Sequence, residues 1–235
     1  MEEKDKPPLS FEPRQARKGA AVERTSTLRG LRNRAGLGVK WVSGFITHLK
    51  EATFILRDFY NYSIFQVFLR YTMIIGLISD THIPERAKKL PKEIFEHFSD
   101  VDLIIHCGDV TSESVLKDLE KISKISVVSG NMDSMNYPKE RELIIENFKI
   151  GIIHGNQIHP RGDTLKMKYL CLEKNWDILI SGHTHVPMIK EITVENKKIL
   201  LLNPGSPTVP RYPLKTIMKL KIEDKKVDAE LIPIK

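Results

Sequence analysis

The sequence predicts an α/β fold whose polar chemistry lies at the carboxyl ends of parallel strands. From residue 74 onward, short apolar runs of strand length alternate with segments of helical periodicity, as in a succession of βαβ units. Five of these runs stop at Gly, Asp, Asn or His. Parallel strands buried on both faces read as continuous Val, Ile and Leu runs, and open α/β sheets bind ligands beyond the carboxyl ends of their strands. We therefore expect these polar residues to meet at one edge.

Each of the five strand ends offers at least one side chain that can ligate a metal. In chain order they are Asp80 and His82 after residues 74–78, Asp109 after 103–107, Asn131 after 125–128, His154 after 150–153, and His183 and His185 after 178–181. Any one of these residues alone is weak evidence, since a lone histidine is more often a core or loop residue. The evidence is the coincidence of suitable residues at five strand ends.

Helical patterns separate these strands, and more strands follow them. Apolar periodicity predicts helices over residues 86–99 and 112–123, with Ser112 as an N-cap, and a third from Asp163 or Thr164 to about Asn175. The end of the chain differs in kind, because four short strands with Pro-rich loops between them read as a meander. These strands are residues 191–194, 198–202, 216–222 and 227–232.

Residues 1–72 differ in composition from residues 73–235, and we expect them to be an extension outside the folded domain. Residues 1–40 have too few large apolar groups to pack and are expected to be disordered. Residues 41–71 permit amphipathic helices, which could bind a membrane surface or a partner. We prefer the alternative that the extension is non-native, because Met73 stands directly before the first core strand.

Charge and composition argue against several functional classes. Residues 1–72 contain 13 Lys and Arg against 7 Asp and Glu, whereas residues 73–235 contain 24 against 23. The near-neutral body argues against a nucleic-acid partner, which would require a basic face.

No apolar stretch is long enough for a membrane span, and the first twenty residues lack the apolar core of a signal peptide. With only Cys107 and Cys171 and no disulfide pattern, we expect a cytoplasmic protein.

The ligand set favours two metal ions over one. Asp80 and His82, like His183 and His185, lie two residues apart, so an extended backbone points both side chains to the same side. Seven donors exceed one tetrahedral site and suit two ions about 3.5–4 Å apart that share a carboxylate. Asp109 is central in the ligand order and is the natural bridge. Imidazole, carboxylate and amide donors favour Mn, with Ni, Co, Fe and Zn as alternatives, over Mg.

These motifs resemble the D-x-H, G-D, G-N, H-G and G-H-x-H series of the calcineurin-like metallophosphoesterase superfamily, in the compact spacing of its small bacterial and archaeal phosphodiesterase branch. The resemblance covers residues 73–235. It implies a four-layer α/β/β/α sandwich and a dimetal phosphodiesterase, in which a metal-bridging hydroxide attacks a small phosphodiester in line. It implies one ion held by Asp80, His82, Asp109 and His185, and a second held by Asp109, Asn131, His154 and His183.

The resemblance also implies roles in catalysis. Asn131 ligates an ion and donates its amide N–H to the phosphate, while Asp109 bridges. Many members have a histidine after this asparagine that is thought to assist the leaving group, but this chain has Met132. His82 is a candidate substitute, and Asp133 a candidate for orienting a neighbour.

Four further features are left with two interpretations each. Arg161 and Arg211 either steer a phosphate or are plain surface residues. The segment 203–206 either belongs to the site, as it does in this branch, or is only a turn. His106 either supports a neighbour or is satisfied in the core.

Two other functions compete with the enzyme. One is a non-catalytic protein-binding scaffold, as in the retromer subunit of the same superfamily, and the other is a nuclease. All seven ligand positions hold competent residues, which argues against the scaffold, and the near-neutral body argues against the nuclease. The oligomeric state is left open, and a homo-oligomer is compatible with the sequence.

Overall fold

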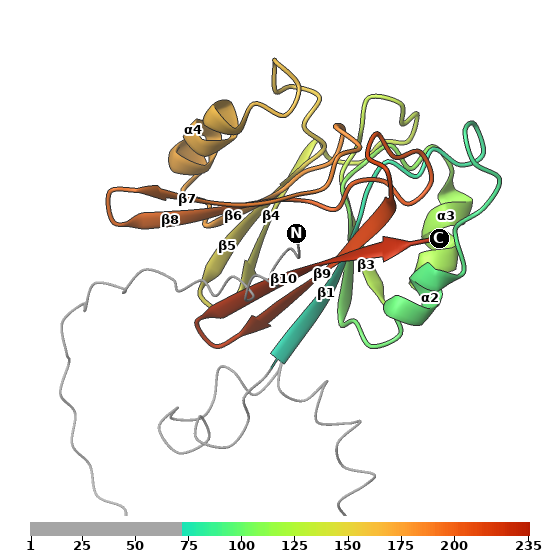
Figure 1. Ribbon diagram of the computed structural model, residues 1–235, viewed down its shortest axis with the longest axis horizontal. Coiled ribbons are helices and arrows are strands. Elements are labelled where there is room, and N and C mark those ends of the chain that lie inside the picture. Colours follow the sequence, from blue (N-terminus) through green and yellow to red (C-terminus); the bar gives the residue numbers. More distant parts are fainter. Residues whose placement is uncertain (1–71) are drawn as a thin grey trace, which may run out of the picture. The chain divides into compact units, whose positions relative to one another are not determined.

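The computed structural model describes residues 72–235, so our predictions for residues 1–71 lie outside the described residues. The described part contains two five-stranded β-sheets and three helices (Figure 1). The first sheet has the order β10 (Lys226–Ile234), β9 (Lys215–Glu223), β1 (Thr72–Ile78), β2 (Leu103–His106) and β3 (Lys124–Val127). The second has the order β4 (Glu140–Ile145), β5 (Phe148–Ile153), β6 (Ile178–Ile180), β8 (Lys197–Asn203) and β7 (Met188–Val194). The helices are α2 (Glu93–His97), α3 (Glu113–Glu120) and α4 (Thr164–Lys174).

Both sheets are mixed, and each contains three adjacent parallel strands. In the first sheet β1, β2 and β3 are parallel, while β9 and β10 are antiparallel additions beside β1. In the second sheet β5, β6 and β8 are parallel, and the antiparallel strands β4 and β7 form the two edges. The carboxyl ends of the parallel strands therefore share one edge within each sheet.

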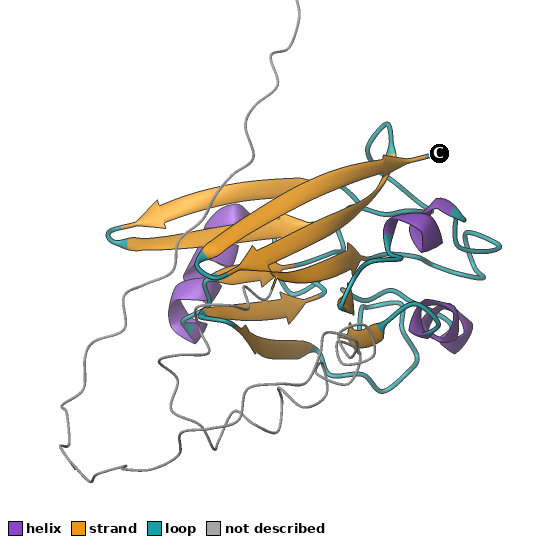
Figure 2. Ribbon diagram, turned by 90° about the horizontal axis from the view of Figure 1, so that it is seen from below, coloured by secondary structure: helices purple, strands orange, loops and turns teal. Residues whose placement is uncertain are grey.

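The two sheets stack on each other, and the helices cover their outer faces (Figure 2). Alternation along β1 shows how the sequence specifies this arrangement. Ile75 and Leu77 pack in the core between the sheets, together with Ile150 and Ile180 of the second sheet. Ile78 belongs instead to the cluster that includes α2 and α3, and a third cluster joins α4 to the second sheet. The predicted four-layer α/β/β/α sandwich is confirmed.

The helices begin and end largely where capping chemistry predicted, with one exception. Ser112 caps α3 by accepting from the Ser114 N–H, and Asp163 caps α4 by accepting from the N–H groups of the first turn. The helix predicted over residues 86–99 was wrong in extent, because only Glu93–His97 is helical. Pro91 explains the difference, since the residue before a proline is pushed out of the helical region. None of the three described helices has the length and apolar character needed to cross a membrane.

Two further differences concern strands. The sequence did not predict β4, an edge strand whose residues are exposed or only partly buried and which pairs antiparallel with β5. The predicted meander was also wrong, because β7 and β8 belong to the second sheet whereas β9 and β10 belong to the first. Local periodicity identified these strands but carries no information about which strands pair. The crossing matters for function, because the loop between β8 and β9 passes the site.

Candidate functional site

Loops from both sheets meet where the predicted ligands lie. The first sheet brings the loops after β1, β2 and β3, and the second brings the loops after β5 and β6. Hydrogen bonds join the two sides: the His183 N–H donates to Asp80 Oδ2 (2.9 Å), and His154 Nδ1 lies 2.8 Å from the Cys107 carbonyl oxygen. The site is therefore built between the two halves of the sandwich.

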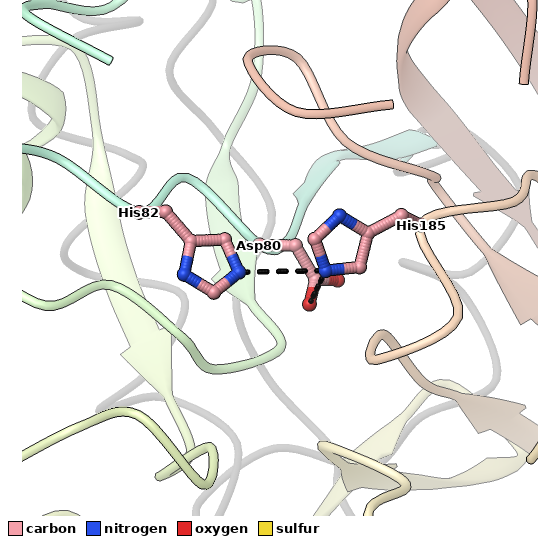
Figure 3. Close-up of side chains that lie close together, drawn as sticks. All are labelled: Asp80, His82 and His185. Carbon is pink, nitrogen blue, oxygen red and sulfur yellow. Dashed lines mark hydrogen bonds and ion pairs between the residues drawn. The ribbon is translucent and has the colours of Figure 1, made fainter. Parts of the chain in front are cut away.

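Asp80, His82 and His185 form one tight, buried group (Figure 3). Asp80 Oδ1 lies 3.2 Å from His185 Nε2, and the His82 and His185 Nε2 atoms lie 3.4 Å apart. The two rings stack with their centroids 5.1 Å apart. Two imidazole nitrogens and a carboxylate oxygen facing one another form a donor set of the kind that holds a divalent cation.

Asp80, Asp109 and His154 form a second buried group that adjoins the first. Asp109 Oδ2 lies 3.4 Å from His154 Nε2 and also 3.4 Å from His82 Nε2, so this one oxygen faces both groups. The other oxygen, Oδ1, accepts from the Met132 N–H at 2.8 Å, which fixes the carboxylate in this orientation. Asp109 thus occupies the position that a bridging carboxylate requires.

Backbone carbonyls set the tautomers of two histidines. A carbonyl oxygen can only accept, so His154 Nδ1 must donate to the Cys107 carbonyl, and His185 Nδ1 to the Val209 carbonyl at 2.5 Å. In each neutral ring the lone pair is then on Nε2, the nitrogen that faces the carboxylates. Orientation of this kind is typical of metal-binding histidines.

Unpartnered polar atoms test whether the site fits metal ions. Among the residues that the structure describes, Asp80 Oδ1 and His154 Nε2 are buried and have no hydrogen-bond partner. Leaving such an atom unsatisfied costs roughly 1–3 kcal/mol. Cations held between the two groups would satisfy both atoms, so the residues present fit divalent ions.

The electrostatics keep most of these groups in ligand form at neutral pH. Burial raises the pKa of Asp109, but the neighbouring His154 ring, the Met132 N–H and His82 together lower it to about 2. Burial lowers the pKa of His82, and it lowers that of His183 to about 4 with help from His154 and Arg161. His154 differs, because burial lowers its pKa but the neighbouring carboxylates of Asp109 and Asp80 and the Cys107 carbonyl together raise it. Metal binding there would compete with a proton.

The ligand-bearing turns have an uncommon backbone. Five of the seven predicted ligands have positive φ angles: Asp80 (54°), His82 (45°), Asp109 (54°), His183 (65°) and His185 (58°). Only a few per cent of non-glycine residues adopt this left-handed conformation, which costs roughly 1–3 kcal/mol and tends to cluster at functional sites. All five lie in the loops that follow β1, β2 and β6.

Segment 203–208, which begins at the last residue of β8, forms hydrogen bonds to two of these turns. Asn203 Nδ2 donates to the Gly182 carbonyl at 2.8 Å, and its Oδ1 accepts from the Gly205 N–H at 2.9 Å. Ser206 Oγ donates to the Asp80 carbonyl at 2.8 Å, and Thr208 Oγ1 donates to the Thr81 carbonyl at 2.7 Å. Of the two interpretations for residues 203–206, the contacts favour membership of the site.

His106 supports the first ligand loop from below. It is fully buried, which lowers its pKa to about 4 and keeps the ring neutral. Its Nδ1 accepts from the Gly108 N–H at 3.3 Å, so Nε2 carries the proton and faces Thr81 Oγ1 at 3.2 Å. Thr81 stands between Asp80 and His82, so both interpretations of His106 hold, since it is satisfied in the core and supports a neighbour.

Asp133 orients the turn that carries Asp109. Its Oδ2 accepts from the N–H groups of Asp109 (2.9 Å) and Gly130 (2.7 Å), and its Oδ1 accepts from the Thr111 N–H (2.8 Å). Three backbone donors converging on one carboxylate match the orienting role that the sequence suggested.

Asp133→Asn is expected to lower metal affinity and kcat/KM by about 10–100-fold, as is typical when a group supporting a metal ligand is removed. The amide keeps one acceptor oxygen but turns an NH₂ group toward backbone N–H donors. Calorimetric metal titration together with initial rates measures the effect. Asp118→Asn is the matched control, because Asp118 is an exposed carboxylate on α3 that pairs with Lys121. Equal losses of metal affinity and kcat/KM in the two variants would contradict the assignment.

A pocket opens beside the two groups. It is lined by His82, Arg86, Asp109, Asn131, Met132, Arg161, His183, His185 and Arg211. Asn131 and His183, the two remaining predicted ligands, thus lie at its wall, and the His183 ring centroid is 5.0 Å from that of His154. Arg161 and Arg211 are exposed and border this pocket, and so does Arg86. Sequence reasoning missed Arg86, although it lies only four residues after His82.

Comparison with known proteins agrees with this geometry. Residues 73–225 match the model of the calcineurin-like phosphoesterase superfamily domain. A probable metallophosphoesterase of Methanocaldococcus jannaschii is 56% identical over 163 residues, which cover 69% of this chain and 82% of that protein. A probable metallophosphoesterase of Methanothermobacter thermautotrophicus is 49% identical over 163 residues, which cover 68% of this chain and 92% of that protein.

Solved structures show the same fold. Vacuolar protein sorting 29 from Cryptosporidium parvum superposes with a TM-score of 0.59 at 25% identity, covering 70% of this chain and 98% of that one. Vps29 from Entamoeba histolytica complexed with Zn²⁺ gives 0.57 at 28% identity, covering 68% and 99%. A novel archaeal phosphodiesterase gives 0.54 at 27% identity, covering 69% and 100%.

Proposed function

Because the chain belongs to the calcineurin-like phosphoesterase superfamily, we propose that it is a dimetal phosphodiesterase acting on a small diester. Membership of this family supports a metal-dependent phosphoesterase, which is a hydrolase that uses divalent ions. The position of Asp109 carries the finer proposal, since Oδ2 lies 3.4 Å from an imidazole nitrogen of each ligand group. Likeness to an archaeal phosphodiesterase supports the choice of a diester. We assign the activity to residues 73–235, and the cytoplasmic location stays a prediction.

We assign one ion to Asp80, His82, Asp109 and His185, and the other to Asp109, Asn131, His154 and His183. Manganese is our first choice, because the set mixes imidazole nitrogens with carboxylate and amide oxygens. When bound, two such ions supply an activated water as nucleophile and neutralise the phosphate oxygens.

The chain's own residues position the substrate and hold the charges. Asp109 is anionic at neutral pH and stays oriented by the Met132 N–H, so it can serve both ions without rearranging. Asn131 lines the pocket, where its amide N–H can donate to a phosphate oxygen. His82 Nε2 faces Asp109 and His185, which favours a ligand role over proton donation to the leaving group.

Met132 sets the expected dependence on the leaving group. It is 44% exposed and lines the pocket, and a thioether cannot donate a proton. We expect aryl diesters to be hydrolysed much faster than alkyl diesters of the same size. Met132→His should accelerate the alkyl substrates by up to about 10²-fold, the lower end of the range for general acid catalysis, and aryl substrates much less.

A series of diesters that differ only in leaving-group pKa measures this effect. Met132→Leu is the matched control, because it keeps the apolar volume and adds no proton donor. A rate independent of leaving-group pKa in the unchanged protein would contradict the prediction.

The competing function is a protein-binding scaffold, which the structural likeness to vacuolar protein sorting 29 favours. The Entamoeba relative is complexed with Zn²⁺, so metal binding alone does not separate scaffold from enzyme. Turnover does. The fully metallated protein should hydrolyse bis(p-nitrophenyl) phosphate faster than the monoester p-nitrophenyl phosphate. No hydrolysis across aryl, nucleotide and phospholipid-headgroup diesters would favour the scaffold, and cleavage of plasmid DNA or RNA in preference to all of these would favour the nuclease.

A further inference from the structure

Arginine is rare in this part of the chain and is concentrated at the pocket. Residues 73–235 contain 20 lysines but only 4 arginines. Arg86, Arg161 and Arg211 all line the pocket, and no lysine does. The fourth, Arg141, is used elsewhere, where its Nε donates to the Val127 carbonyl at 3.0 Å. The body of the protein thus uses lysine for general surface charge and arginine for this site.

The three pocket arginines come from three separate loops and border different parts of the site. The backbone N–H of Arg86 donates to the His82 carbonyl at 2.9 Å, and the backbone N–H of Arg211 donates to the His185 carbonyl at 3.0 Å. Since the rings of His82 and His185 stack, the backbones of Arg86 and Arg211 are held beside the same pair of histidines. Arg161 lines the same pocket from the loop between β5 and α4.

None of the three guanidinium groups has a carboxylate partner among the described residues. Within residues 72–235, no carboxylate lies within ion-pair distance of Arg86, Arg161 or Arg211. Guanidinium presents a planar fork of donors that matches phosphate and carboxylate, a match that the ammonium group of lysine lacks. Exposed, unpaired arginines on a pocket wall are therefore available to a ligand anion.

We propose that these arginines bind a second anionic group of the substrate, a phosphate or carboxylate separate from the diester that is cleaved. The inference rests on the proposed phosphodiesterase function. Two divalent ions bring four positive charges, of which Asp80 and Asp109 neutralise two, so the ions already suffice for a singly charged diester. Three further permanent charges exceed what such a substrate needs, and they match a substrate with additional negative charge.

A matched pair of substrates tests the inference. Thymidine 5′-(p-nitrophenyl phosphate) and its 3′-phosphorylated form share the leaving group and the nucleoside and differ by one phosphate. We expect kcat/KM to be about 10-fold higher for the 3′-phosphorylated form, mainly through KM, as one or two charge-assisted hydrogen bonds would give. Arg86→Ala and Arg211→Ala should remove most of this advantage while lowering the rate on the simple diester by a smaller factor.

Lys89→Ala is the control for net charge, because Lys89 is exposed in the same loop as Arg86 and does not line the pocket. It should leave the ratio between the two substrates unchanged. Equal kcat/KM for the two substrates, or the same loss of advantage in Lys89→Ala as in Arg86→Ala, would overturn the proposal.

A binding measurement separates this inference from the proposed activity. Protein stripped of metal is titrated calorimetrically with inorganic pyrophosphate and with malonate, and we expect at least one to bind. Combined replacement of the three arginines by Gln should weaken that binding about 10-fold or more. Tighter binding of pyrophosphate would assign a phosphate, and tighter binding of malonate a carboxylate. Arginine-dependent binding without turnover would count against the phosphodiesterase alone, whereas binding that ignores the arginines would overturn the anion site.

Discussion

Asp109→Asn is expected to lower kcat/KM by at least about 10³-fold, the largest effect of any single substitution in this chain, since stabilisation of several kcal/mol by the ions would be lost. The amide oxygen can keep the hydrogen bond from the Met132 N–H, so the turn should keep its shape. The NH₂ group would then point at the Nε2 atoms of His82 and His154, where Oδ2 now lies. Both ions would lose a ligand, and a negative charge would disappear between them.

Initial rates and elemental analysis of the purified variant measure this effect together. His82→Ala is the comparison, because it removes a ligand from one ion only and should be less damaging. Circular dichroism checks that both variants fold. If Asp109→Asn retained a tenth of the rate while His82→Ala did not, the bridging assignment would be wrong.

Removal of metal by a chelator is expected to abolish hydrolysis, and Mn, Co or Ni should restore it better than Mg. Four of the seven proposed ligands are imidazoles, whereas Mg prefers oxygen and retains several waters. Rates after dialysis against each ion, with the metal content measured in parallel, provide the test. Full activity in Mg alone, in protein that binds no transition metal, would contradict the ligand assignment.

The same treatment should lower the thermal stability of the protein. Ligands from both sheets meet at the site, so the ions bind the folded protein and not the separated halves. At a metal concentration 100-fold above Kd, each bound ion adds about 2.7 kcal/mol of stability, and in a domain of this size one ion alone raises Tm by roughly 5–10 °C. Asp109→Asn should show little of this shift, which differential scanning calorimetry can measure.

The sequence was informative wherever a physical requirement is local. A strand buried on both faces must be apolar throughout, so the runs leading to Asp80, Asp109 and His154 were visible as strands with ligands at their ends. Caps are local too, which is why α3 and α4 begin at Ser112 and Asp163 as predicted.

Apart from the extent of the first helix, the features that the sequence did not reveal depend on partners far away in the chain. Strand β4 is an edge strand with little buried surface, so its sequence lacks a strong apolar pattern. The division of the last four strands between two sheets is a matter of pairing, which periodicity does not encode. Arg86 became recognisable as a pocket residue only when three distant loops were seen to border the same space.

Left-handed backbone at five ligand positions has an evolutionary consequence. Each position holds an aspartate or a histidine in a conformation that glycine adopts without steric penalty. In a lineage that no longer used its ions, replacing such a ligand by glycine would relieve backbone strain and remove a buried polar group. The substitution would then be expected to stabilise the fold. This chain keeps an aspartate or a histidine at all five positions, which is what continued use of the ions would require.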